Sequence, residues 1–154
     1  MTLSKAKCGG GLSYILTLAD IMAELEETEE GKEVIRVFKT TKYPFIVPNV
    51  FKRGNEDKPE FVFGEILKNN EIRFRVDTIQ KAINYNSDFC TEKQIWAFNY
   101  FVDYVRKTEK TKKFYLENHD LVLINNKTTL HGRSSFTDYD RHLLRIRMNK
   151  FSKV

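Results

Sequence analysis

The chain has 154 residues, of which 41% are hydrophobic and 31% are charged, and its formal net charge is +5. This composition argues for one globular domain, residues 1–154, and against a disordered chain. No apolar run approaches the roughly 20 residues needed to cross a bilayer, and the basic residues are scattered rather than gathered into a stripe for nucleic acid. Cys8 and Cys90 form no paired-cysteine zinc motif, so a reduced, cytoplasmic setting fits best.

The first half of the chain is predicted to hold one helix among short extended segments. Thr17 can cap a helix whose apolar residues recur at helical spacing, and Gly31 marks a stop after an acidic stretch. We expect strands at 12–16 and 34–38, and an irregular segment at 45–47 between two prolines. Residues 9–11, three glycines in a row, predict a backbone that is flexible and open to close approach.

The second half is predicted to be mostly extended, with one further helix. Residues 61–76 suggest a hairpin that turns at Asn69-Asn70, and Thr91 with Gln94 makes a capping box for a helix ending near Lys107. Further strands are expected at 112–117, 121–124, 128–133 and 141–148, with 121–124 buried because it is continuously apolar. The pattern predicts a mainly β fold with two helices, an antiparallel sandwich or barrel.

The last predicted strand has two chemically different faces. Its alternating residues are Arg141, Leu143, Arg145 and Arg147 on one face and His142, Leu144, Ile146 and Met148 on the other. The second face should pack on the core. Three like charges are costly on a buried face unless anions pair with them, so the arginine face looks either into water or into a site that binds an acid. The fork of an arginine suits a carboxylate.

An ordered block of motifs ends the chain. It consists of residues 120–126, Leu130-His131-Gly132-Arg133, Phe136 and Arg141-His142-Leu143-Leu144-Arg145. This block resembles the clavaminate synthase and taurine dioxygenase group of iron(II)- and 2-oxoglutarate-dependent oxygenases, although family members usually have Asp-Asn at positions 125 and 126. Near the other end, Gly10-Gly11-Leu12-Ser13 resembles the family's Gly-Gly-x-Thr segment. The resemblance spans nearly all of the chain and implies a partial double-stranded β-helix, or jelly-roll.

The resemblance also implies the cofactors and their ligands. Fe(II) would be held by His131 as the distal ligand, and the carboxylate of the co-substrate 2-oxoglutarate would be bound by Arg141, with Arg145 beside it. Ser13 is the matching candidate for the hydroxyl that helps to bind 2-oxoglutarate. From the residues alone, a single histidine is more often a packed or surface residue than a metal ligand.

The implied activity is hydroxylation of a small substrate, such as an amino acid or derivative, with release of succinate and carbon dioxide. Arg73 and Arg75 fall where the family has an arginine-bearing strand that often faces the substrate, although a solvated strand face explains them equally well.

Two iron ligands are missing from the sequence. The family's iron is held by two histidines and one carboxylate, the first histidine and the carboxylate coming from a His-x-Asp or His-x-Glu motif. None of His119, His131 and His142 is followed two residues later by Asp or Glu. We therefore expect the C-terminal portion of a dioxygenase domain, inactive alone. It is a truncated gene product, a half completed by a separate N-terminal polypeptide, or a remnant that only binds. The rival interpretation is a basic β-module for an anionic partner such as nucleic acid.

Overall fold

The computed structural model describes residues 2–4, 8, 10–52, 58–137, 142–146 and 148. The chain divides into two compact units. Unit 1 takes in Met1–Ile15, Lys112–Asn125 and His131–Val154, and unit 2 takes in Leu16–Thr111 and Asn126–Leu130.

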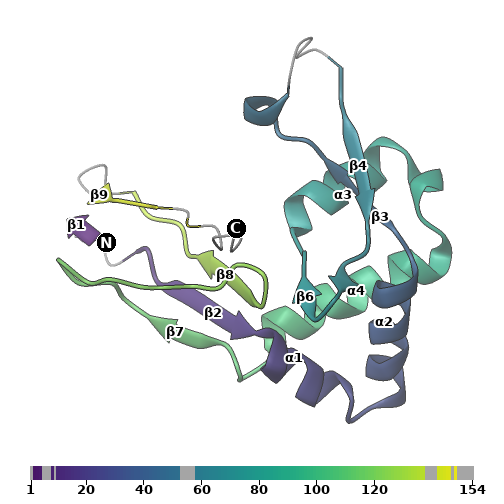
Figure 1. The fold of residues 1–154 in the computed structure, drawn as a ribbon, viewed down its shortest axis with the longest axis horizontal. Coiled ribbons are helices and arrows are strands. Elements are labelled where there is room, and N and C mark those ends of the chain that lie inside the picture. The colour runs from purple at the N-terminus through teal and green to yellow at the C-terminus, as the bar shows by residue number, and fades with distance from the viewer. Residues whose placement is uncertain are drawn as a thin grey trace, which may run out of the picture. The chain divides into compact units, whose positions relative to one another are not determined.

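The described residues form four α-helices, two short 3-10 helices and nine strands (Figure 1). The helices are α1 (Leu18–Leu25), α2 (Glu29–Thr40), η1 (Asn49–Phe51), α3 (Val76–Tyr85), η2 (Ser87–Phe89) and α4 (Glu92–Lys107). The strands are β1 (Thr2–Ser4), β2 (Ser13–Thr17), β3 (Tyr43–Ile46), β4 (Phe61–Gly64), β5 (Leu67–Lys68), β6 (Glu71–Ile72), β7 (Lys112–Phe114), β8 (Thr129–Arg133) and β9 (His142–Leu143). They pair as β1-β9, β7-β2-β8, β3-β4 and β5-β6. The expectation of two helices was therefore wrong.

The turn between α1 and α2 explains why Gly31 does not end a helix. Thr17 caps α1 by accepting a hydrogen bond from the amide of Asp20, as its sequence context predicted. Thr28 caps α2 in the same way, with the amide of Gly31 as donor, so Gly31 lies in the first turn of α2. A β-carbon at Gly31 would collide with the backbone carbonyl of Leu25. The glycine is needed for this close approach, and the prediction of a stop was wrong.

Helix α2 occupies the segment for which a strand was predicted at 34–38. Val34, Ile35, Val37 and Phe38 are all buried, and this spacing forms one face of a helix as well as an apolar run. On the outer side, Arg36 donates to the carboxylate of Glu33, and Lys93 of α4 pairs with the same carboxylate. Hydrogen bonding from Arg36, and then from Lys93, lowers the pKa of Glu33 to about 2.

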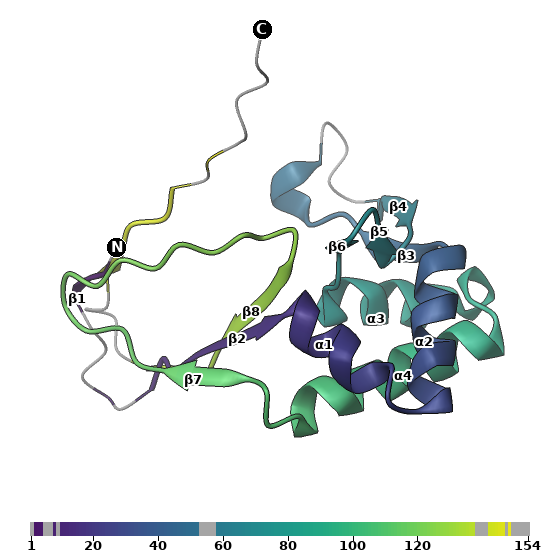
Figure 2. The same ribbon diagram turned by 60° about the horizontal axis from the view of Figure 1, so that its bottom comes forward.

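The core of unit 2 is centred on Phe38, where α2 and α4 lie side by side (Figure 2). The Phe38 ring meets Tyr43 and Phe101 edge-on, with centroid separations of 5.5 and 5.2 Å. The Tyr43 hydroxyl donates to the carbonyl of Gln94 at 2.8 Å. Gln94 and Thr91 form the capping box predicted for α4, and the helix ends at Lys107 as expected.

The predicted hairpin at 61–76 is only partly right. Its Asn69-Asn70 turn is confirmed, with φ values of 51° and 57°, but the turn joins the two-residue strands β5 and β6. Strand β4 pairs instead with β3, which occupies the stretch expected to be irregular around 45–47. From Val76 the chain forms α3, which buries Ile79, Ala82 and Ile83 at helical spacing and packs against β3.

Unit 1 is built from short strands and carries exposed apolar side chains. Strand β1 is anchored by backbone bonds, because the Thr2 amide donates to the Asp120 carbonyl and the His119 amide donates to the Thr2 carbonyl. The chain turns at His119, whose φ is 69°. The buried strand expected at 121–124 is not, since Leu121 and Leu123 are 67% and 74% exposed and no described residue covers them. Leu144, Ile146 and Met148 are also exposed, which corrects the expectation that this face packs on the core.

Candidate functional site

His131 lies in the second half of β8, within unit 1. Its side chain is exposed, as are Gly132 and Arg133 after it. No atom of the described residues lies within 4 Å of the position of a β-carbon at Gly132. The Arg133 guanidinium lies over the ring of Phe136, 4.2 Å from its centroid. The His131 imidazole is therefore on the exposed part of β8.

The glycine-rich segment near the start of the chain is fastened to the residues after His131. The Ser134 hydroxyl accepts hydrogen bonds from the amides of Gly11, at 3.1 Å, and Leu12, at 2.9 Å. The Gly11 amide is also within 3.3 Å of the Ser135 carbonyl, and the Ser134 amide donates to the Leu12 carbonyl at 2.9 Å. We call these four hydrogen bonds the Ser134 clamp. They bring two motifs together that lie more than a hundred residues apart in the sequence.

The glycines of this segment are required by the clamp. A β-carbon at Gly10 would lie 2.6 Å from the Ser135 carbonyl oxygen and 3.0 Å from Phe136. Gly11 has a φ of 81°, in the left-handed region that side chains other than hydrogen rarely adopt. Ser13 lies two residues after Gly11, as the first residue of β2, where it is partly buried and lies opposite Phe114 of β7.

Ser134 is the residue that sequence reasoning missed. Its position directly after His131-Gly132-Arg133 was visible, but a hydroxyl that accepts from two backbone amides is recognised only when those amides are known to be near. The structure says little about the two arginines that are expected to bind 2-oxoglutarate. Arg141 lies outside the described residues, and Arg145 is described and exposed.

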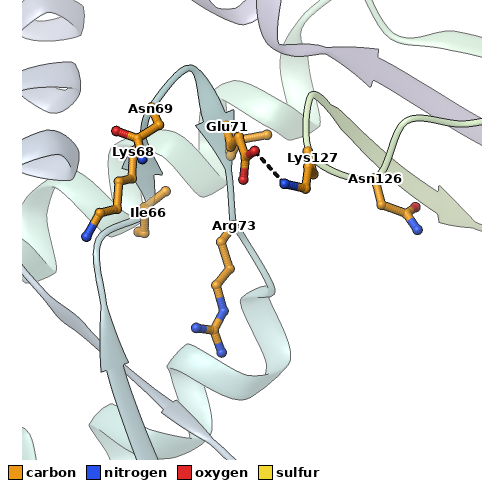
Figure 3. Close-up of a pocket in the computed structure, with 8 residues that line it drawn as sticks. Ile66, Lys68, Asn69, Glu71, Arg73, Asn126 and Lys127 are labelled. Carbon is orange, nitrogen blue, oxygen red and sulfur yellow. Dashed lines mark hydrogen bonds and ion pairs between the residues drawn. The ribbon is translucent and has the colours of Figure 1, made fainter. Parts of the chain in front are cut away.

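Arg73 and Arg75 lie in unit 2 and have different surroundings. Arg75 is the N-cap residue of α3 and pairs with Asp77 at 3.3 Å. Arg73 follows β6, and its guanidinium lies over the ring of Phe45, 4.2 Å from the centroid. Arg73, but not Arg75, lines the cavity of about 260 Å³ beside the β5–β6 hairpin (Figure 3).

The described residues do not fit an iron site. Among them, no group of three or more histidine, cysteine, aspartate or glutamate side chains is placed to hold a metal ion. Burial raises the pKa of the Cys90 thiol to about 11, so this cysteine stays protonated and is a poor ligand. His131 would be one ligand of the three that the two-histidine, one-carboxylate arrangement requires.

Comparison with known protein families identifies the family of this chain. The family model for the taurine catabolism dioxygenase TauD, TfdA family matches residues 4–147. The chain belongs to the TauD, TfdA family. The family predicted from the motifs is thereby confirmed. TauD-family proteins are 2-oxoglutarate-dependent oxygenases that generally use Fe(II).

Two further findings are negative. No curated protein matches the chain. In the part of the chain that the structure describes, no helix has the length and apolar character needed to span a membrane.

Proposed function

We propose that this TauD-family chain supplies the co-substrate side of an iron(II)- and 2-oxoglutarate-dependent dioxygenase. The observation that carries the proposal is the Ser134 clamp, because it joins the segment that contains Ser13 to the strand that contains His131. By family resemblance, Ser13 then offers its hydroxyl to 2-oxoglutarate and His131 its imidazole to the metal. The substrate that fits this family is a small molecule such as an amino acid or derivative, hydroxylated as succinate and carbon dioxide are released.

Arg141 and Arg145 complete the proposed co-substrate side. A guanidinium presents its donors as a planar fork, which matches a carboxylate in two parallel hydrogen bonds. By resemblance to the family motif, Arg141 is proposed to take the role of the carboxylate-binding arginine, with Arg145 supporting it. In this proposal these two arginines bind and orient the acid, and neither takes part in bond breaking.

The remaining metal ligands are proposed to come from a second polypeptide that carries a His-x-Asp or His-x-Glu motif. Two observations support this. The 154 residues contain no such motif, and unit 1 exposes apolar side chains that a covering layer would bury. The exposed residues are Leu121, Leu123, Leu144, Ile146 and Met148. We propose that the partner adds strands and apolar cover to unit 1, and in doing so completes the jelly-roll.

The experiment compares the purified chain with the chain mixed with a polypeptide that carries the missing motif. Succinate release is measured with Fe(II) and 2-oxoglutarate present. We expect release only from the mixture, and none when His131 is replaced in H131A. His119→Ala is the matched control, because His119 lies in a surface turn outside the family motifs. No succinate from the mixture would overturn the split-enzyme proposal.

A second arm tests the co-substrate arginine. Arg141→Ala should raise the 2-oxoglutarate concentration needed for half-maximal release, while R106A, on the exposed side of α4, should not. The rival basic module predicts something different. Nucleic acid would bind with an affinity that falls steeply with salt and does not change in H131A. That result, together with no succinate, would replace the proposal with the rival function.

A further inference from the structure

The β5–β6 hairpin presents one apolar face and one charged face. Leu67 lies opposite Ile72 in the pairing, and Lys68 lies opposite Glu71. Side chains alternate along a strand, so Leu67 and Ile72, both buried, point to one side, and Lys68 and Glu71 point to the other. The tight turn at Asn69-Asn70 closes this end.

The charged face continues one residue beyond the paired strands. The Arg73 amide donates to the Ile66 carbonyl at 2.8 Å, which places this pair next in register. Ile66 and Arg73 therefore share the face of Lys68 and Glu71. Figure 3 shows Lys68 and Arg73 extending in the same direction from the two sides of the hairpin, with Ile66 between them.

A third segment walls the cavity from the other side. The Ile72 amide donates to the Lys127 carbonyl at 2.7 Å, and the Lys127 ammonium pairs with Glu71 at 2.7 Å. Asn126 precedes Lys127 and also lines the cavity, together with Asn69. The result is a space of about 260 Å³ with an isoleucine floor, two side-chain amides and four charged groups.

Among the residues that the structure describes, the charges of this cavity leave the Arg73 guanidinium without a carboxylate partner. Lys127 is paired with Glu71, and Lys68 is paired with Glu65 at 3.3 Å. Arg73 has no carboxylate partner among the described residues, and its guanidinium lies over the Phe45 ring instead. A cation over an aromatic ring is held in place without losing its hydrogen-bond donors at the edge of the guanidinium plane. Those donors are available to an anion.

We propose that this cavity binds the carboxylate of a small organic acid, with Arg73 as the fork that grips it. One free guanidinium fits one carboxylate, since two parallel hydrogen bonds match the two planar groups. Ile66, on the charged face, offers apolar contact to a short carbon chain, and the cavity is smaller than those that enclose drug-sized ligands. The inference that the cavity binds an acid depends only on the residues named here. The further inference that it is the substrate site of a dioxygenase rests on the proposed function.

The test is a titration of the full chain with butyrate, followed by ¹H–¹⁵N NMR, with no metal present. Butyramide, which has nearly the same shape without the charge, is the matched ligand control. We expect butyrate to shift the amide signals of residues 66–73 and of Lys127, and butyramide to leave them unchanged. In R73Q the affinity for butyrate should fall about tenfold or more, as a lost charge-assisted pair implies. Arg73 is exposed, so this variant should keep its fold.

Arg75→Gln is the matched protein control. Arg75 is also exposed and lies only two residues away, but it pairs with Asp77 and does not line the cavity. An equal loss of affinity in R75Q would overturn the inference, as would no binding of butyrate to the unaltered chain. Binding of inorganic phosphate as tight as that of butyrate would overturn the assignment to carboxylates. Because no turnover is measured, failure of the dioxygenase assay with butyrate binding intact would count against the proposed function alone.

Discussion

Removing the Ser134 hydroxyl is the most direct test of how the two family motifs are held together. In S134A the Leu12 amide loses the acceptor that it now has at 2.9 Å, while the Gly11 amide keeps the Ser135 carbonyl at 3.3 Å. The backbone hydrogen bond from Ser134 to the Leu12 carbonyl also remains. The substitution therefore removes a hydroxyl and little else.

The expected size follows from the number of bonds lost. One intramolecular hydrogen bond contributes about 0.5–1.5 kcal/mol. At 1.4 kcal/mol for each factor of ten, hydrogen exchange at the Leu12 amide should therefore be faster by about 2- to 12-fold. Exchange at Gly11 should rise less, because its second acceptor remains. Amide exchange followed by NMR resolves both residues in one experiment.

Ser135→Ala is the control for this measurement. Ser135 is the adjacent serine, its side chain is exposed, and it takes part in the clamp through its backbone carbonyl only. Exchange at Leu12 should be unchanged in S135A. Equal acceleration in the two variants, or none in S134A, would refute the idea that the hydroxyl of Ser134 fixes this segment.

Three further predictions concern unit 2, each measured by unfolding. Phe38→Leu removes two edge-on ring contacts and should lower the free energy of unfolding by about 1–3 kcal/mol, whereas F51L, at an exposed ring, should change it by less than about 0.5 kcal/mol. Gly31→Ala should lower stability by about 1–3 kcal/mol, because overpacking against the Leu25 backbone exceeds the helix-propensity gain of alanine, and a net increase would contradict the close approach. The pKa of Glu33 is lowered from 4.5 to about 2 in the folded chain, so its ion pairs stabilise unit 2 above pH 4.5 and lose this effect as the pH falls toward 2. The unfolding midpoint of E33Q should be lower than that of the parent chain at pH 6, and the two midpoints should converge at pH 2. A difference that persisted at pH 2 would contradict this assignment.

The features predicted correctly from sequence are those whose cause is local. The caps at Thr17 and Thr91 depend on a hydroxyl reaching an amide three residues later, and the turn at Asn69-Asn70 depends on asparagine tolerating positive φ. Each is complete within a few residues. No distant part of the chain is needed to satisfy it.

The errors occur where one pattern fits two structures. Residues 34–38 are apolar and β-branched or aromatic except for Arg36, a composition that suits a strand. The deciding signal lay upstream, in Thr28 followed by Glu29 and Glu30, a typical helix start. At 121–124 the run is apolar too, but burial depends on a covering layer, and no described residue provides one. Composition alone does not reveal whether that layer exists.

The candidate site divides in the same way. The motifs around His131 and Gly10–Ser13 could be identified from sequence order, and they led to the family that the comparison confirms. The contact of these motifs through Ser134 depends on tertiary structure and could not be identified from sequence order. The same is true of the difference between the surroundings of Arg73 and Arg75.

The two units are also held by different forces, and this bears on the proposed function. The buried apolar cluster around Phe38 lies entirely in unit 2, whereas the motif residues of unit 1 are fastened by backbone pairing and the Ser134 clamp. Net hydrogen-bond contributions are near 1 kcal/mol each, but burial of a large side chain contributes about 1.5–3 kcal/mol. Because the proposed co-substrate site is held mainly by hydrogen bonds, added apolar cover would contribute most to its stability. A partner that buried Leu121 and Leu123 would therefore stabilise His131 and Ser13 in place as well as supply the missing ligands.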